Sequence, residues 1–197
     1  MKTLAIVAHP HIEHSRVNAR WMKALQQAPD IQVKDLITLY PDYQFDLDQE
    51  QADLIQADRI ILQFPLFWYS CPALLKKWID DVFTPGFAYA RNGDKLKGKE
   101  LMLCISVGAP EDGYRATGFN HFTLDELLRP FQQTANYIKA RMVPPFIFYE
   151  SVFASDEQIE ASAQAMLAHV TGVCEPASVV YEKLLLTAEV MNVALVS

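Results

Sequence analysis

The feature of this chain best suited to chemistry is a run of three aromatic residues, Phe67 to Tyr69. It lies between an apolar segment, 59–64, whose pattern predicts a buried strand, and a segment, 72–83, whose spacing predicts a helix with proline at its first position. Parallel α/β sheets bind ligands at such strand-to-helix turns. Because exposed neighbouring aromatics are costly unless a flat molecule covers them, the run predicts a wall or floor for a planar ring. Packing into the core beneath a loop is the alternative.

A second candidate site is the loop that follows the first predicted strand. Ser15, Arg16 and Asn18 fall at a predicted helix start, where free backbone N–H groups and the helix dipole favour a phosphate group. His9 and Arg16 can add positive charge. The loop has no glycine, which excludes the glycine-rich nucleotide-binding loops. A plain helix cap and a metal site made of three histidines within 9–14 are the alternatives, but no carboxylate or cysteine set has the spacing to complete a metal site.

A third candidate segment, 106–120, follows the fourth predicted strand. Gly108 in this segment allows a ligand to approach the backbone closely. Tyr114 carries a phenol, and phenols have an ordinary pKa of about 10. Near neutrality the phenol therefore keeps its proton and can donate a proton or a hydrogen bond to a reacting group. A packing role on the loop is the alternative for Tyr114.

The elements that must position these loops are strands and helices in alternation. The predicted strands are 2–8, 31–36, 59–64, 99–106 and 141–149, and the predicted helices are 15–28, 48–57, 72–83, 122–139 and 155–169. Pro130 predicts a kink or boundary in the fourth helix. Such alternation implies parallel strands joined by right-handed crossovers. We therefore expect an α/β fold, a flavodoxin-like three-layer sandwich with a five-stranded parallel sheet in the order 2-1-3-4-5, which brings the three loops to one end.

The composition narrows the class of protein. A chain of 197 residues, 51% hydrophobic and 21% charged, suits one domain, which we expect over 1–171, with a tail over 172–197 that includes a possible helix at 178–194. The net charge of -7 and the lack of a long basic cluster argue against nucleic acid or an anionic membrane as a direct partner. The pattern predicts neither an export signal nor a membrane span. Three widely spaced cysteines suggest neither disulfides nor zinc, so the cytoplasm is the expected location.

Together the loops resemble the NAD(P)H:quinone oxidoreductase family of flavodoxin-like flavoproteins, in particular its compact bacterial branch. The resemblance covers about 2–169 and rests on three groups of residues: His9, Pro10, Ser15, Arg16 and Asn18; Phe64, Pro65, Leu66, Trp68, Pro72, Ala73, Leu75, Lys76 and Trp78; and Phe87, Ala88 and Tyr89.

This resemblance implies a flavin site. By this resemblance, the phosphate region of the flavin is bound by His9, Ser15, Arg16 and Asn18. The edge of the flavin ring is contacted by Pro65, Leu66, Phe67 and Trp68, and the ring site is completed by Ser106, Val107, Gly108 and Ala109. Relatives with a tyrosine and a histidine acting near the flavin place them in the loop after strand four. Here Tyr114 stands at the tyrosine position, Asn120 stands at the histidine position, and His121 is one residue late, so these three are the catalytic candidates.

The resemblance also implies cofactors and partners. The short chain resembles members that use FMN rather than FAD, with NADPH or NADH as co-substrate and a quinone as acceptor in ping-pong hydride transfer. It further implies a homodimer in which Phe87 and Tyr89 close the partner's pocket. Some compact relatives are instead ancillary subunits of potassium-efflux transporters, so a membrane transporter is the alternative partner. A one-electron flavodoxin carrier is a third alternative, which the aromatic loop disfavours.

Overall fold

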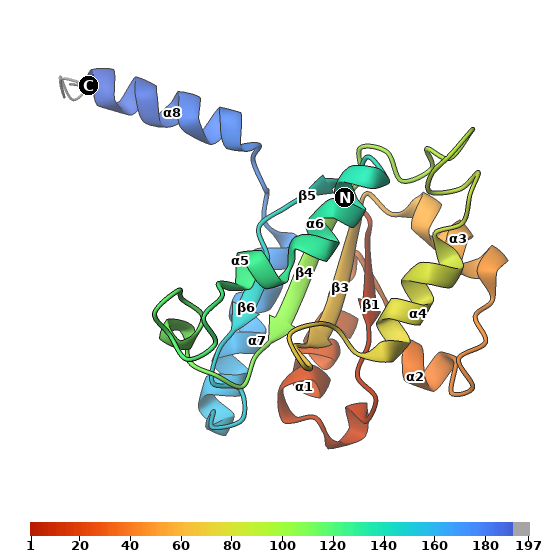
Figure 1. The fold of residues 1–197 in the computed structure, drawn as a ribbon, viewed down its shortest axis with the longest axis horizontal. Coiled ribbons are helices and arrows are strands. Elements are labelled where there is room, and N and C mark those ends of the chain that lie inside the picture. The colour runs from red at the N-terminus through yellow and green to blue at the C-terminus, as the bar shows by residue number, and fades with distance from the viewer. Residues whose placement is uncertain (191–197) are drawn as a thin grey trace.

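The computed structural model describes residues 1–190, with side chains through Thr187, and forms a three-layer α/β sandwich (Figure 1). The strands of its parallel sheet are β1 (Thr3–Val7), β2 (Ile31–Asp35), β3 (Arg59–Pro65), β4 (Glu100–Ser106), β5 (Arg141–Met142) and β6 (Phe146–Phe148). They follow the order β2-β1-β3-β4-β5, and β6 also pairs with β4, so the predicted fold class and strand order are confirmed.

The helices are α1 (Arg16–Gln26), α2 (Leu36–Leu39), α3 (Leu47–Gln56), α4 (Ala73–Val82), α5 (Leu124–Leu127), α6 (Arg129–Tyr137), α7 (Asp156–Thr171) and α8 (Ala177–Val190). Two 3-10 turns lie at Ile12–His14 and Glu111–Gly113. None of the helices within residues 1–190 combines the length and apolar character needed to cross a membrane. The predicted helix 178–194 corresponds to α8 up to Val190, and its remaining positions lie outside the described residues.

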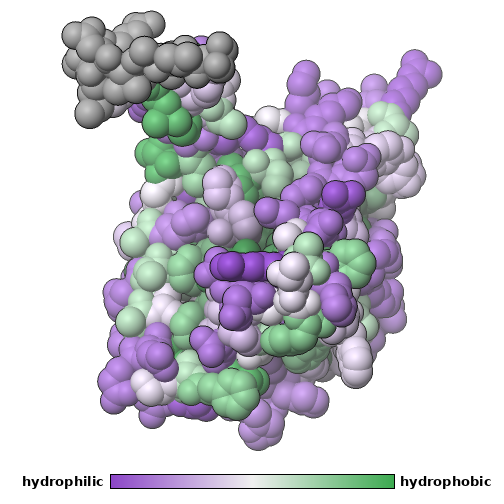
Figure 2. Space-filling model, turned by 60° about the vertical axis from the view of Figure 1, so that its left-hand side comes forward, coloured by the Kyte–Doolittle hydropathy of each residue, from purple (hydrophilic) through white to green (hydrophobic). Residues whose placement is uncertain are grey.

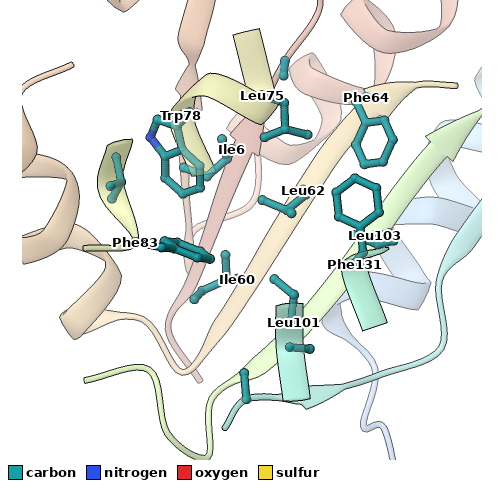
Figure 3. Packing of buried hydrophobic residues seen from close by; sticks show 14 of the residues in the cluster. Ile6, Ile60, Leu62, Phe64, Leu75, Trp78, Phe83, Leu101, Leu103 and Phe131 are labelled. Atoms are coloured by element: carbon teal, nitrogen blue, oxygen red, sulfur yellow. The ribbon is translucent and has the colours of Figure 1, made fainter. Parts of the chain in front are cut away.

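Two hydrophobic cores flank the sheet. Helices α3, α4 and α6 cover one face, where Trp78 is fully buried and the rings of Phe64 and Phe131 stack with centroids 5.2 Å apart (Figure 3). Helices α1 and α7 cover the other face, where Trp21 is fully buried and its indole N–H donates to the Ser162 hydroxyl at 2.9 Å. Both faces are apolar because the central strands β1 and β3 are buried along their whole length.

The strand register brings the three candidate loops to one edge. In β1 and β3, Val7 lies opposite Gln63, and in β3 and β4, Pro65 lies opposite Ser106. Parallel strands that end level with one another release their loops side by side. Strand β3 runs one residue further than predicted because Pro65 closes it at its carboxyl end, where the next amide, that of Leu66, donates to the Ser106 carbonyl at 2.9 Å.

The fifth strand differs from its prediction. A single strand over 141–149 is wrong, because the segment divides into β5 and β6 around Pro144 and Pro145. Proline has no backbone N–H to donate to a ladder, and two in succession interrupt the pairing with β4. The boundary expected at Pro130 is confirmed, since α5 ends before it and Pro130 lies in the first turn of α6.

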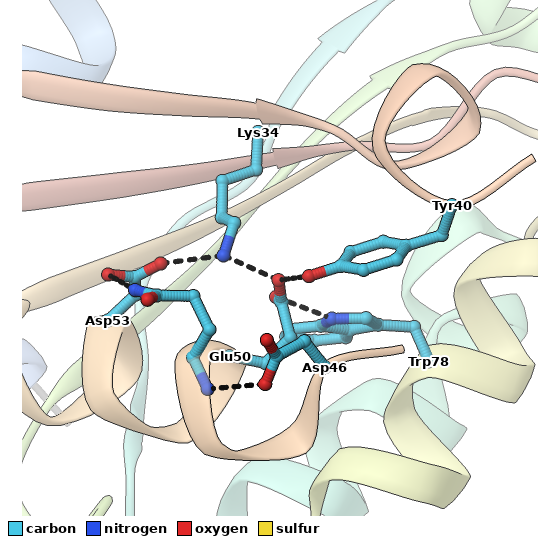
Figure 4. Close-up of polar contacts among 7 residues, drawn as sticks. Lys34, Tyr40, Asp46, Glu50, Asp53 and Trp78 are labelled. Atoms are coloured by element: carbon cyan, nitrogen blue, oxygen red, sulfur yellow. Dashed lines mark hydrogen bonds and ion pairs between the residues drawn. The ribbon is translucent and has the colours of Figure 1, made fainter. Parts of the chain in front are cut away.

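A buried polar cluster connects side chains of β2, α3 and α4 on one face of the sheet (Figure 4). The Lys34 ammonium contacts the carboxylates of Glu50 at 2.5 Å and Asp53 at 2.6 Å. Glu50, which is fully buried, also accepts hydrogen bonds from the Tyr40 hydroxyl at 2.6 Å and the Trp78 indole at 2.9 Å. Burial and the bond to Glu50 raise the pKa of Tyr40, so its hydroxyl remains a donor. Glu50 is therefore the central residue of the cluster, because Lys34, Tyr40 and Trp78 all contact its carboxylate.

Candidate functional site

The three loops predicted to converge do meet at the carboxyl edge of the sheet. The rings of His9 and Phe67 pack edge to face with centroids 6.0 Å apart, which joins the loop after β1 to the loop after β3. The Tyr69 hydroxyl donates to the Asn120 side-chain carbonyl at 3.1 Å, which joins the loop after β3 to the loop after β4. One continuous surface therefore carries residues from all three loops.

The start of α1 offers donors to an anion. Ser15 caps the helix as predicted, because its hydroxyl oxygen accepts from the Asn18 amide at 3.0 Å. The amides of Arg16 and Val17 make no hydrogen bond with any residue that the structure describes. His9 accepts at Nδ1 from the His11 amide at 3.1 Å, which places the proton of neutral His9 on Nε2. Burial lowers the pKa of His9, so the neutral form prevails at neutral pH.

Arg16 has a partner that sequence reasoning missed. Its guanidinium contacts the carboxylate of Asp156, the first residue of α7, at 2.6 Å, although the two residues are 140 positions apart. Both side chains are largely exposed, so the ion pair is weak and can exchange for another anion. No local pattern in the sequence could have predicted this contact.

Asn18 and Ser106 lie beneath this surface rather than on it. The Asn18 side-chain amide donates to the Ser106 hydroxyl at 2.9 Å, and both residues are buried. Gln63, a second residue that sequence reasoning missed, donates from its side chain to the Asn18 carbonyl at 2.9 Å. These contacts fasten the start of α1 to the ends of β3 and β4, so Asn18 and Ser106 hold the loop in place.

The aromatic loop is a tight hairpin that displays its rings. Phe67 and Ser70 exchange two backbone hydrogen bonds of 3.0 Å, and between them Trp68 and Tyr69 have φ angles of 48° and 63°. Two left-handed residues make a type I′ turn, an unusual conformation for bulky side chains. The exposed fractions of Phe67, Trp68 and Tyr69 are 42%, 93% and 49%, which rules out core filling as the role of these rings. Pro65 and Leu66 support the hairpin from within the fold, the first buried and the second packed against the core.

The loop after β4 contributes backbone groups. Val107 is buried, and its amide and carbonyl pair with Phe148 and Ser151, each at 2.9 Å. The amides of Gly108 and Ala109 make no hydrogen bond within residues 1–190. A Cβ added at Gly108 would meet only the Val152 side chain, at 3.7 Å, so internal packing does not require glycine there. The two amides are therefore donors that no described residue uses.

A family model described as the flavodoxin-like fold matches residues 1–170. The chain belongs to this flavodoxin-like family. It is 50% identical over 167 residues to an uncharacterized NAD(P)H oxidoreductase of Bacillus subtilis, covering 85% of this chain and 96% of the relative. It is 43% identical over 148 residues to the glutathione-regulated potassium-efflux system ancillary protein KefG of Cronobacter sakazakii, covering 75% of this chain and 80% of the relative.

Solved structures resemble the flavodoxin-like domain closely. General stress protein 14 of Treponema denticola, in complex with FMN, has a TM-score of 0.83 at 41% identity, covering 87% of this chain and 98% of that one. An NADPH-quinone reductase of P. pentosaceus has a TM-score of 0.80 at 35% identity, covering 88% of this chain and 99% of that one.

Within this flavodoxin-like domain, the three catalytic candidates lie in different settings. Tyr114 is mostly buried and packs against Tyr149, with ring centroids 6.2 Å apart. Burial, with the neighbouring Tyr69, raises the pKa of Tyr114. The Asn120 side-chain N–H group is buried and has no partner among the described residues, whereas His121 is exposed at a φ of 61°. Tyr114 and Asn120 thus both neighbour the aromatic loop.

One expectation about the surroundings of the site is wrong. Phe87 is buried in the core of its own chain and is not available to close a pocket on another. Tyr89 is partly exposed, and its ring packs against that of Tyr137 with centroids 5.5 Å apart.

Proposed function

We propose that this protein is an NAD(P)H oxidoreductase that binds FMN and passes electrons from NADPH or NADH to a quinone-type acceptor. FMN, when bound, accepts a hydride from the nicotinamide and passes two electrons to the acceptor. The observation that carries the proposal is an exposed aromatic hairpin beside open backbone amides from two other loops, at the ligand-binding edge of the sheet. The relatives named as oxidoreductases support the activity.

The residues at the start of α1 fit the phosphate of FMN. The unpaired amides of Arg16 and Val17, the Arg16 guanidinium and the proton on His9 Nε2 are all donors. A phosphate group carries only acceptors, and the helix dipole adds to its attraction. A structural relative is an FMN complex, so we favour FMN over FAD.

The aromatic hairpin and the loop after β4 suit the flavin ring. Phe67 and Trp68 supply a flat apolar wall, and the amides of Gly108 and Ala109 can donate to ring carbonyls. Such fixed donors stabilise negative charge that develops on a ring during reduction. We expect the nicotinamide and the acceptor to bind in turn at the same exposed face of the flavin ring. The reaction is then ping-pong, because the first product leaves before the second substrate binds.

The first test is to identify the chromophore. We expect the purified protein to absorb in the visible range, to release FMN on heat extraction, and to give parallel double-reciprocal plots when NADPH and a quinone are varied. Release of FAD would refute the choice of cofactor. Failure to bind either flavin on reconstitution would refute the proposed function.

Replacing Tyr114 with phenylalanine is expected to slow reduction of bound FMN by NADPH about tenfold or more, because a positioned donor is lost. The fold and FMN occupancy should be unchanged, since only a hydroxyl is removed. Stopped-flow absorbance measures the reduction rate directly. Tyr149→Phe is the matched control, because it removes the hydroxyl of the ring packed against Tyr114. An equal rate in Tyr114→Phe and the wild type would leave only a packing role for Tyr114.

A second candidate function is the activation of a potassium-efflux transporter, which the relationship to the ancillary protein KefG favours. In that case we expect a cytoplasmic protein that associates peripherally with membranes containing the transporter. Sedimentation of the protein with such membranes, and not with membranes lacking the transporter, is the measurement that separates the two functions.

A further inference from the structure

The C-terminal helix α8 is apolar and projects away from the sandwich (Figure 1). The exposed fractions of Val180, Tyr181, Leu184 and Leu186 are 44%, 62%, 62% and 61%. These side chains lie on more than one side of the helix, since positions 180 and 184 share a face that 186 does not. Apolar side chains that cover this much of a helix surface are ordinarily buried. The chain itself does not bury α8 within residues 1–190.

An apolar groove of about 650 Å³ lies where α8 joins the body. The first turns of α8 form one wall through Val180 and Leu184, and the body forms the other through Leu128, Val143 and Pro144. Figure 2 shows hydrophobic residues gathered at this junction. The groove is concave and mostly apolar, with Asp125, Arg141 and Glu175 also in its lining, and the helix beside it is convex and mostly apolar.

We propose that α8 of one chain packs in the groove of a second copy, and that the second copy's α8 packs reciprocally in the groove of the first. A two-fold interface requires a surface that is complementary to itself. Neighbouring convex and concave apolar surfaces on one chain satisfy this requirement, because a two-fold axis brings each helix to the other groove. A helix of 14 residues is about 21 Å long, enough for three to four turns of contact.

The charges of α8 argue against a lipid surface as the occupant. Helices that lie on membranes usually carry several lysines or arginines on their polar face. From Ala177 to Thr187 there is one cation, Lys183, and it already pairs with Glu175. The neighbouring Glu182 is an exposed acid. With two acids and one lysine in its sequence, α8 lacks the cations that would hold it on an anionic lipid surface.

The helix half of this contact lies outside the part of the chain that matches the flavodoxin-like family. The family match ends at residue 170, before α8, and the Bacillus subtilis relative is matched over 96% of its own length. The pairing of α8 therefore adds to any association that the shared domain makes by itself, and it does not depend on the proposed function.

Light scattering after gel filtration tests this proposal on the full chain. We expect Val180→Glu with Leu184→Glu to halve the mass of the wild type, from dimer to monomer, or from tetramer to dimer if the domain also pairs elsewhere. Ile55→Glu is the matched control, because Ile55 is an apolar residue of α3 with 45% exposure, away from the groove. It should leave the mass unchanged.

Unchanged far-ultraviolet circular dichroism and thermal unfolding in the double variant would show that its fold is intact. A monomeric wild type, or an equal mass in the double variant and the wild type, would overturn the proposal. So would a monomeric wild type that floats with vesicles of phosphatidylcholine and phosphatidylglycerol, which would assign α8 to lipid.

Discussion

Replacing Ser15 and Arg16 together with alanine is expected to weaken FMN binding by about tenfold to a hundredfold. The Arg16 guanidinium would lose its bond to the phosphate, and loss of the Ser15 cap would loosen the first turn of α1 that holds the phosphate donors. A hydrogen bond to a charged group contributes about 1.5–3 kcal/mol. Each 1.4 kcal/mol corresponds to about a factor of ten in the dissociation constant. Titration of the apoprotein with FMN, followed by quenching of FMN fluorescence, measures the change.

The ion pair with Asp156 supplies the control for this experiment. Asp156→Asn removes the competing carboxylate but keeps Arg16, so FMN should bind at least as tightly as in the wild type. If the Ser15→Ala, Arg16→Ala variant keeps the wild-type affinity, the phosphate is not held at the start of α1. If Asp156→Asn loses affinity to the same extent, the effect arises from the packing of α1 against α7 and not from the phosphate.

Glu50→Ala is expected to lower the free energy of unfolding by about 3–5 kcal/mol, the cost of breaking a buried ion pair. The change leaves the Lys34 ammonium without its closest carboxylate and removes the acceptor of both Tyr40 and Trp78. Urea unfolding followed by circular dichroism measures the loss. Asp53 is expected to limit it by retaining its own contact with Lys34.

Lys76→Ala is the control for this prediction. It breaks the exposed pair between Lys76 and Asp80 on α4, and exposed pairs usually contribute less than about 1 kcal/mol. Equal losses in Glu50→Ala and Lys76→Ala would show that the buried cluster adds no more stability than a surface pair. Glu50→Ala also removes the acceptor of Tyr40 and Trp78, so the comparison measures the whole buried cluster against one surface pair.

The strand order and the meeting of the loops were predictable because both follow from alternation. Parallel strands joined by helices leave few arrangements, and each of them places the loops at the carboxyl ends. The cap at Ser15 and the boundary at Pro130 were predictable because each depends on local backbone chemistry. Pro144 and Pro145 carried an equally local signal, and the prediction of one strand through them overlooked their missing N–H groups.

The contacts that modify the site were not predictable. Arg16 with Asp156, and Asn18 with Ser106, join residues that only the folded chain brings together. The burial of Lys34 opposes the usual preference of lysine for solvent, and it depends on acids from another element. Periodicity assigns residues to faces of helices and strands, but it does not pair a side chain on one element with a side chain on another.

The exposed Trp68 allows ligand binding at the site to be followed by tryptophan fluorescence. Of the three tryptophans, Trp21 and Trp78 are 0% exposed and Trp68 is 93% exposed. Emission from an indole in water lies at longer wavelength than emission from an indole in a protein core, so the red edge of the spectrum comes from Trp68. Soluble quenchers such as acrylamide should reach this component first. A flat ring that covers the hairpin shields Trp68 from them, so occupancy of the hairpin can be followed in unlabelled protein.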